Sequence, residues 1–351
     1  VPRSNGLRAE ATAVERFTRH SGFVIAAMII GHQRQIRYFE RVLARGTLAH
    51  AYLFLGPEGL GKRTVALDVA RALLCTRQPR RLGGCGECDE CGRVGTSAHP
   101  DLLTLSPDRR LVAEDSEEIG VKQARELERL LALRSWAGGW RVVLIDEAER
   151  MSREAQSALL KTLEEPGPQV LFFFVSARPG MLLPTIHSRC VAVHFAAMSD
   201  AALEPLLGKA PEKERSWLLA LADGRPGVLL KLRDDPSFRA ALERDREHVT
   251  RLLGADLAAA LAFSDAESRE PGRLESLFRS MLGMLRRRFH DHLARVRPSR
   301  DGKTEDELKA LHETLAVGLH YAIILETAAV NRRLLADGFF VAYQTLAVHP
   351  A

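Results

Sequence analysis

A phosphate-binding loop pattern lies near the start of this 351-residue chain, in the stretch GPEGLGKRT at residues 56–64. Glycines such as Gly59 and Gly61 let backbone N–H groups turn inward around phosphates, and a helix N-terminus adds positive potential. Lys62 would reach the β- and γ-phosphates of a nucleotide. The stretch follows an apolar run and opens a helical pattern, the context that a working loop requires. A glycine-rich turn without a ligand is the alternative interpretation.

The loop departs from its pattern at Arg63, where a Ser or Thr hydroxyl would bind Mg²⁺. Thr64 cannot replace that hydroxyl, because a side chain one place along a helix is rotated by about 100°. Arg63 also brings a cation toward the metal position, which disfavours Mg²⁺. We therefore expect at most weak ATP binding and crippled metal-assisted hydrolysis.

A second candidate for nucleotide chemistry is the acidic pair Asp146-Glu147, which ends the apolar run RVVLID. Asp146 would hold Mg²⁺ through its water shell, and Glu147 could polarise an attacking water. The alternative is a surface pair that opens a helix, where the helix dipole favours acidic residues.

Metal-ligand chemistry is indicated by four cysteines spaced C-x9-C-x2-C-x2-C, which are Cys75, Cys85, Cys88 and Cys91. Short loops of this kind bring sulfurs onto one ion, and four thiolates leave no open position for catalysis. The spacing predicts a structural Zn²⁺ site. Disulfides and an iron–sulfur cluster are the alternatives.

A possible phosphate-directed cation is Arg189, in the segment PTIHSRC that precedes the last apolar run. It is either an ordinary surface arginine or an arginine finger that stabilises transition-state charge on a phosphate bound elsewhere. Cys190 reads as a small core residue rather than a nucleophile.

The elements that must position these residues alternate between short β-rich runs and helical patterns. The runs are 51–56, 101–105, 141–146, 170–176 and 191–195, and the helical patterns between them include 61–74, 121–134 and 152–165. This alternation predicts a five-stranded parallel sheet in an α/β domain, with strands buried on both faces. After residue 196 helical spacing takes over, for example at Leu274, Leu277, Phe278, Met281 and Leu285.

Composition sets broad limits on the function. The net charge of +5 is too small to indicate nucleic-acid binding by itself. The sequence contains no run of 18 apolar residues, so it does not predict a membrane-spanning helix. The stretch GFVIAAMII at 22–30 loosely resembles a signal segment but lacks a convincing cleavage site. We expect residues 1–27 to be an extraneous or disordered extension.

Several motifs together resemble one family. They are the stretch from Gly31 to Thr64, which ends in the phosphate-binding loop (the P-loop, residues 56–64), the four-cysteine module, HPD (99–101), VKQAREL, VVLIDEAERM, ALLKTLEEP and TIHSRC. These motifs are similar to those of the bacterial clamp-loader AAA+ proteins. The similarity is strong over residues 31–195, fair over residues 196–245 and weak over the remaining residues. The resemblance implies an AAA+ core at 28–195 with a zinc module at 75–91, a small helical lid at 196–245 and an all-α oligomerisation collar at 246–351.

The resemblance also implies partners and a location. It predicts a cytoplasmic hetero-pentamer with the gamma/tau and delta subunits, which opens a sliding clamp and places it on primed DNA. Ser188-Arg189-Cys190 matches the family's SRC motif, whose arginine acts in trans on ATP held by the neighbouring motor subunit.

Two departures from the family's motor subunit favour a non-hydrolysing stator. Arg63 removes the metal hydroxyl, and Gly227 stands where the motor's lid motif carries an arginine. The alternative interpretation is a gamma/tau-like motor subunit or an autonomous AAA+ ATPase. A third interpretation is a zinc-dependent DNA-binding regulator. Turnover near one per second by the isolated chain would contradict the stator interpretation.

Overall fold

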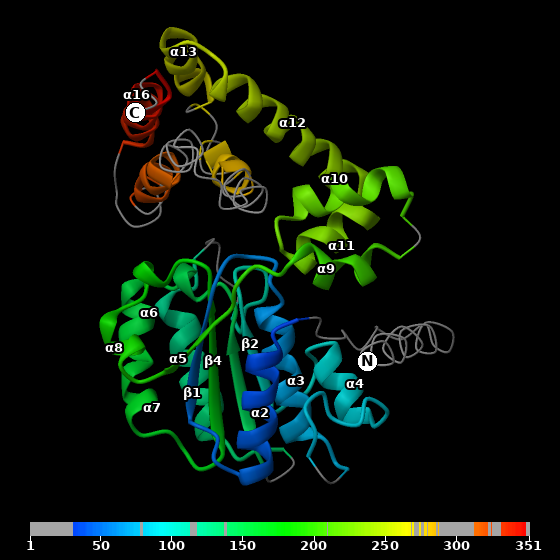
Figure 1. Ribbon diagram of the computed structural model, residues 1–351. Helices are drawn as coiled ribbons and strands as arrows, with labels where there is room; N and C mark the ends of the chain where they lie inside the picture. Colours follow the sequence, from blue (N-terminus) through cyan, green and yellow to red (C-terminus); the bar gives the residue numbers. More distant parts are fainter. Residues whose placement is uncertain are drawn as a thin grey trace, which may run out of the picture. The chain divides into compact units, whose positions relative to one another are not determined.

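The computed structural model of the chain describes most of residues 31–267 and several C-terminal segments (Figure 1). The described residues are 31–77, 80–112, 118–136, 139–208, 210–267, 269, 274, 277, 278, 280–285, 287, 312–321, 324 and 331–348. The expected extension at 1–27 lies outside them. They form two compact units, one from residues up to 208 with Gly224–Gly227 and one from 209–223 and 228 onward. The three-part division expected from the sequence remains a prediction.

The first unit is built on a parallel sheet with the strand order β2-β3-β4-β1-β5. The strands are β1 (Ala51–Leu55), β2 (Leu102–Leu105), β3 (Arg141–Ile145), β4 (Val170–Ser176) and β5 (Val191–His194). Each begins and ends within one residue of its predicted run. The α/β class and the five-stranded parallel sheet are therefore confirmed.

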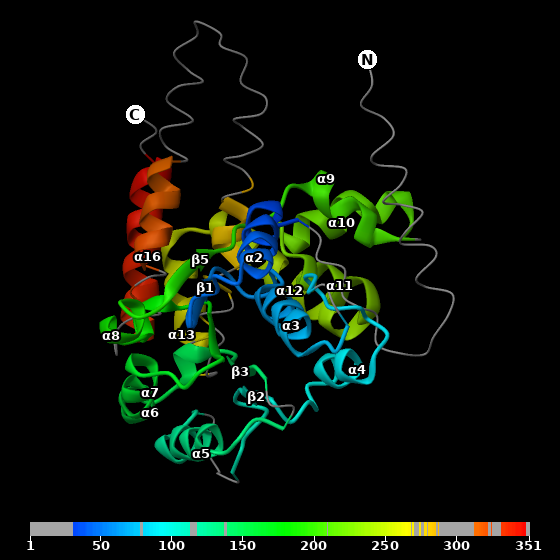
Figure 2. The same ribbon diagram turned by 90° about the horizontal axis from the view of Figure 1, so that it is seen from below.

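Helices cover both faces of the sheet (Figures 1 and 2). One face carries α2 (Gln33–Arg45) and α3 (Lys62–Leu74), with α4 (Asp89–Gly95) beside α3. The other carries α5 (Val121–Ala132), α6 (Arg153–Ala158), α7 (Leu160–Glu164) and α8 (Pro184–His187). An apolar core fills each side of the sheet: the first core lies between the sheet and α2 and α3, and the second between the sheet and α5 to α8. Alternate residues of β1 enter these two cores, since Tyr52 and Phe54 join the first core and Leu53 joins the second.

Two details of this unit differ from expectation. The helix predicted over 152–165 divides at Leu159, whose ψ of −13° tightens the backbone between α6 and α7. The last strand was expected to be buried on both faces, yet three of its four residues are exposed. β5 is an edge strand that pairs only with β1, so only Val193 packs on the first core.

Four short elements lie within this unit: two follow strands β3 and β4, and two follow β5 and lead to the helical part of the chain. They are the 3₁₀ turns η1 (Ala148–Arg150), η2 (Pro179–Met181) and η3 (Glu204–Leu207) and the helix α9 (Asp200–Leu203). Within the described residues no helix is long and apolar enough to cross a membrane.

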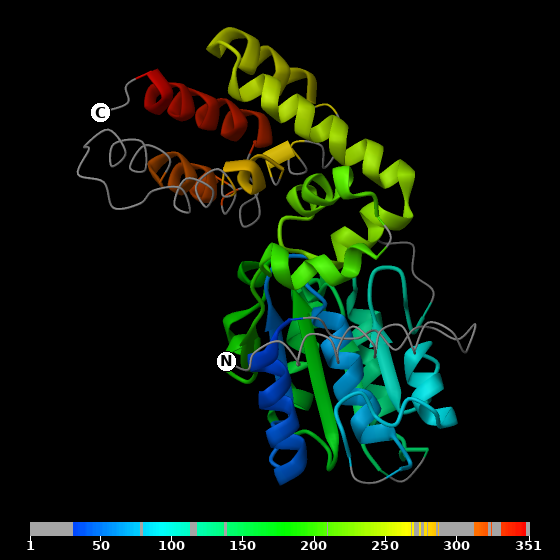
Figure 3. The same cartoon turned by 45° about the vertical axis from the view of Figure 1, so that its right-hand side comes forward.

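The second unit is helical, as predicted after residue 196. It contains α10 (Glu212–Ala222), most of α11 (Pro226–Asp234), α12 (Pro236–Leu253), α13 (Leu257–Glu267) and α16 (Arg332–Val348). Figure 3 shows α13, in yellow, beside α16, in red. The five apolar residues expected at helical spacing between 274 and 285 are all buried in its core, with Phe339 and Phe340.

Candidate functional site

The P-loop connects β1 to α3, as the sequence predicts, and its glycines are required by the backbone. Gly59 and Gly61 have φ angles of 79° and 86°, in the left-handed region that favours glycine. A Cβ atom at Gly56 would lie 2.3 Å from the carbonyl oxygen of Phe195. The loop therefore passes so close to the end of β5 that a side chain at position 56 would displace it.

Lys62 is buried within the loop that it follows. Its Nζ donates hydrogen bonds to the carbonyl oxygens of Gly56, at 2.5 Å, and Pro57, at 2.8 Å. Burial lowers the pKa of Lys62, while the carboxylates of Glu149, Asp146 and Glu58 oppose that shift. The side chain thus lies where a phosphate-binding lysine is needed, with loop carbonyls as its partners.

Arg63 pairs with the aspartate that was predicted to hold magnesium. Its Nη1 lies 3.1 Å from Oδ2 of Asp146, at the end of β3. The two residues are 83 positions apart in the chain, so the fold itself brings them together. The guanidinium takes a carboxylate oxygen that a Mg²⁺ water shell would use, and its charge opposes a divalent cation beside it.

Glu147 follows Asp146 in an uncommon backbone conformation for a residue with a side chain, with φ of 50°. Burial and the neighbouring Asp146 carboxylate raise the pKa of Glu147. A raised pKa suits a group that accepts a proton from water, so the residue keeps one property of a general base.

A further contact to this loop comes from Gly227, the residue expected at the position of the motor subunit's lid arginine. The backbone N–H of Gly227 donates a hydrogen bond of 2.8 Å to the carbonyl oxygen of Gly59. A Cβ atom at position 227 would lie only 3.0 Å from that same oxygen. The absence of a side chain at residue 227 therefore permits this close approach, and an arginine there would push against the P-loop.

The four cysteines expected to bind a metal come together. Their sulfur atoms all lie within 4.8 Å of one another, with 3.9 Å between Cys75 and Cys88 and 3.8 Å between Cys85 and Cys91. A tetrahedron with metal–sulfur bonds of about 2.3 Å has edges of about 3.8 Å. These distances fit one four-thiolate site and exclude disulfides, since sulfurs bonded to each other lie about 2.0 Å apart.

The chemistry of the cysteine cluster also fits a cation. Although burial opposes ionisation, N–H donors from Cys91 and Thr76 lower the pKa of Cys88 to about 6. Burial raises the pKa of Cys91 to about 12. Four neighbouring thiolates repel one another, so all four ionise together only around a positive ion.

Local backbone geometry builds this cluster. Cys88 caps α4, and its sulfur accepts an N–H bond from Cys91. Gly84 has a φ of 67°, and a Cβ atom there would lie 2.6 Å from the Cys91 sulfur. The glycine-rich sequence around the cysteines therefore leaves space for sulfur as well as permitting tight turns.

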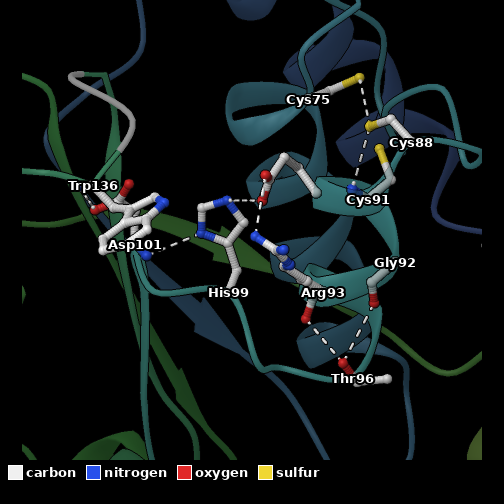
Figure 4. A network of polar contacts seen from close by, with 10 residues as sticks. Cys75, Cys88, Cys91, Gly92, Arg93, Thr96, His99, Asp101 and Trp136 are labelled. Carbon is white, nitrogen blue, oxygen red and sulfur yellow. Dashed lines mark hydrogen bonds and ion pairs between the residues drawn. The ribbon is translucent and has the colours of Figure 1, made fainter.

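A partly buried polar chain, which sequence reasoning missed, ties the cysteine module to the sheet (Figure 4). Glu90, between two of the cysteines, has Oε2 at 2.9 Å from Nε2 of His99, a close contact off the line of a good hydrogen bond. The His99 Nδ1 accepts the N–H of Asp101, whose Oδ1 accepts the N–H of Trp136. The HPD motif that follows the module thus links it to the start of β2 and to the loop before β3.

Arg189 lies at the end of the sheet opposite the chain's own P-loop. It follows α8 and precedes β5, and the next residues pair Val191 with Tyr52 at the start of β1. The P-loop follows the other end of β1, about six residues or about 20 Å along the strand direction. Cys190 packs on the second core, and burial raises its pKa to about 12, as expected of a core residue.

The chain is similar to known bacterial replication proteins. Residues 31–199 match the family described as "DNA polymerase III, delta subunit". DNA polymerase III subunit delta′ of Pseudomonas aeruginosa is 38% identical over 219 residues, which cover 61% of this chain and 65% of that protein. The Escherichia coli subunit delta′ is 30% identical over 255 residues, which cover 71% and 74%.

A relative named for a different subunit is covered over a smaller part of its own length. The Haemophilus influenzae subunit tau/gamma is 34% identical over 174 residues, which cover 50% of this chain and 24% of that protein. The match to the Pseudomonas delta′ subunit spans just under two thirds of that protein. The match to the E. coli subunit spans about three quarters, and with it the chain belongs to the DNA polymerase III subunit delta′ family.

Proposed function

We propose that this chain is a stator subunit of a bacterial clamp loader, which helps to load the sliding clamp onto primed DNA. In this role it supplies Arg189 to ATP bound by a neighbouring gamma/tau subunit and contributes little hydrolysis of its own. The observation that carries the proposal is the placement of Arg189 and the P-loop at opposite ends of the same sheet. An arginine so placed serves a nucleotide on another chain.

The P-loop contacts support the second half of this proposal. Arg63 pairs with Asp146, Lys62 bonds to loop carbonyls, and Gly227 bonds to Gly59. Lys62 and Arg63 would both have to change partners before a nucleotide with Mg²⁺ could take the positions used by the family's motor subunits. We therefore expect weak nucleotide binding and negligible turnover.

The four-cysteine cluster completes the proposal as a structural Zn²⁺ site. Cys75, Cys85, Cys88 and Cys91 would hold the ion, and four thiolates leave no position for a reacting water. When bound, zinc would offset two of the four thiolate charges and fix α4 against α3. Less than half an equivalent of zinc in the purified protein would contradict this assignment.

The test of the stator role is a reconstituted loader with gamma/tau and delta subunits of the same organism. Arg189→Ala should lower clamp-stimulated ATPase by up to the whole contribution of the neighbouring site, because an arginine finger is worth about 10³–10⁵ in rate. Arg129→Ala is the matched control, since Arg129 is also an exposed arginine paired with a carboxylate. Equal ATPase for wild type and Arg189→Ala would refute the proposal.

The alternative of a motor subunit or an autonomous ATPase is tested on the isolated chain. Turnover near one per second, abolished by Lys62→Ala, would favour it over the stator role. A third outcome, salt-sensitive DNA binding by the isolated chain, would favour the DNA-binding regulator.

A further inference from the structure

The guanidinium of Arg189 is engaged within its own chain. Its Nη2 forms an ion pair with Oε1 of Glu164, the last residue of α7. Its Nη1 donates a hydrogen bond of 3.0 Å to the carbonyl oxygen of Thr185 and lies 3.3 Å from Oγ of Ser188. Both terminal nitrogens therefore have partners, which come from α7 and from the α8 segment, two elements on the same face of the sheet.

The pairing is at the protein surface. The side chains of Arg189 and Glu164 are 30% and 50% exposed. Ion pairs at such positions are screened by water, and a typical one changes an equilibrium constant by at most about fivefold. A phosphate is a stronger partner for a guanidinium than this single carboxylate oxygen, because it can accept two parallel N–H bonds from it.

We infer that Glu164 is a resident counterion for Arg189, which the phosphate of a partner-bound nucleotide must displace. This inference rests on the proposed function and names the residue that regulates its central group. The carboxylate keeps the guanidinium at the α8–β5 turn and competes with the incoming phosphate for the same nitrogen. The competition weakens binding in the ground state and the transition state equally, so it raises the apparent KM for ATP and leaves kcat unchanged.

The chain offers a matched control in the adjacent residue. Glu165 is also exposed and carries the same charge, but it lies beyond the end of α7 with a φ of −125°. The ion pair that the structure gives for Arg189 is with Glu164. A general effect of removing negative charge from this surface would therefore appear in both variants, whereas direct competition would appear only at Glu164.

The experiment compares Glu164→Gln, Glu165→Gln and Arg189→Ala in the full chain, each reconstituted with gamma/tau and delta subunits. Clamp-stimulated ATPase is measured against ATP concentration, so that KM and kcat are obtained separately. Glu164→Gln should lower the apparent KM by about two- to fivefold with kcat unchanged, the range set by a surface ion pair. Glu165→Gln should match wild type, and Glu164→Gln should have no further effect in the Arg189→Ala background.

Several results would overturn the inference. They are a wild-type KM for Glu164→Gln, a fall in its kcat, an equal change with Glu165→Gln, or an effect that persists without Arg189. If Arg189→Ala lowers ATPase while any of these occurs, the stator role stands and only the role of Glu164 fails. If Arg189→Ala leaves ATPase unchanged, the proposed function fails and the inference fails with it.

Discussion

Gly84 gives the sharpest test of the metal module, because its replacement by alanine places one methyl group against a ligand. The new Cβ would lie 2.6 Å from the sulfur of Cys91 and 3.1 Å from the carbonyl oxygen of Arg71. Ordinary contact distances are about 3.5–4.0 Å, so the sulfur would have to move by about 1 Å. Metal–sulfur distances tolerate deviations of only about 0.2 Å.

A matched control separates this steric effect from backbone strain. Gly86 has a φ of 73°, close to the 67° of Gly84, and a Cβ there would meet nothing within 4 Å. Both alanine variants bear the cost of a left-handed residue, about 1–2 kcal/mol. Only Gly84→Ala displaces a thiolate, which should lower zinc affinity by more than about 100-fold, because changes one shell further out already cost about 10–100-fold.

The assay is competition for zinc between the full-length protein and a coloured chelator, together with metal content after purification. Gly86→Ala should retain one equivalent of zinc and an affinity within about 30-fold of wild type, as the strain alone dictates. Gly84→Ala should lose the metal to the chelator. Equal zinc affinity for the two variants would refute the four-thiolate geometry.

Three further predictions concern the polar network, the P-loop and a helix start. Burial, opposed by Glu90, lowers the pKa of His99 below its ordinary 6.5, so folding favours the neutral ring. The stability from this effect is present above pH 6.5 and falls as the pH drops below it, because the unfolded chain then binds more protons. His99→Asn keeps an acceptor for the Asp101 N–H, and it should flatten the dependence of unfolding free energy on pH, measured by urea unfolding. An unchanged pH dependence would contradict this prediction. Arg63→Thr should strengthen binding of a fluorescent ATP analogue in Mg²⁺ but not in EDTA, because the substitution frees Asp146 and restores the metal-binding hydroxyl. An unchanged Kd in Mg²⁺ would show that the Arg63–Asp146 ion pair does not limit nucleotide binding. Ser152→Ala should destabilise the first unit by about 1 kcal/mol through loss of the α6 cap bond to the N–H of Ala155, and thermal unfolding that matches wild type would exclude that contribution.

The parts of the fold that the sequence predicts well are those with local causes. Parallel strands buried on both faces are continuous apolar runs, so β1, β3 and β4 could be located from their residues alone. The cysteine spacing likewise predicted the sulfur cluster, because short loops limit where the thiols can lie. The exposure of β5 could not be predicted, since its apolar residues do not reveal that it is an edge strand.

The partners of the site residues depend on contacts between distant segments, which spacing does not encode. The sequence indicated that Arg63 would bring positive charge to the metal position, and the structure supplies its partner, Asp146. Glu164 lies in a motif that pointed only to the family, and its contact with Arg189 joins residues 25 positions apart. No sequence signal joins His99 to Glu90, because that contact depends on how the cysteine module packs beside the sheet.

The P-loop and Arg189 lie at opposite ends of the sheet, so the two ends of this chain would have different roles in the proposed assembly. In the proposed assembly, such chains would contact one another through two different surfaces, the one at the P-loop and the one at Arg189, and would join head to tail. Because Arg63 pairs with Asp146 beside its own P-loop, this chain would supply an arginine to one neighbour without needing one from the other. In the proposed assembly this subunit would therefore stand at one end of the series of ATP sites. A ring that contains it would have one interface without an active ATP site, at a defined place.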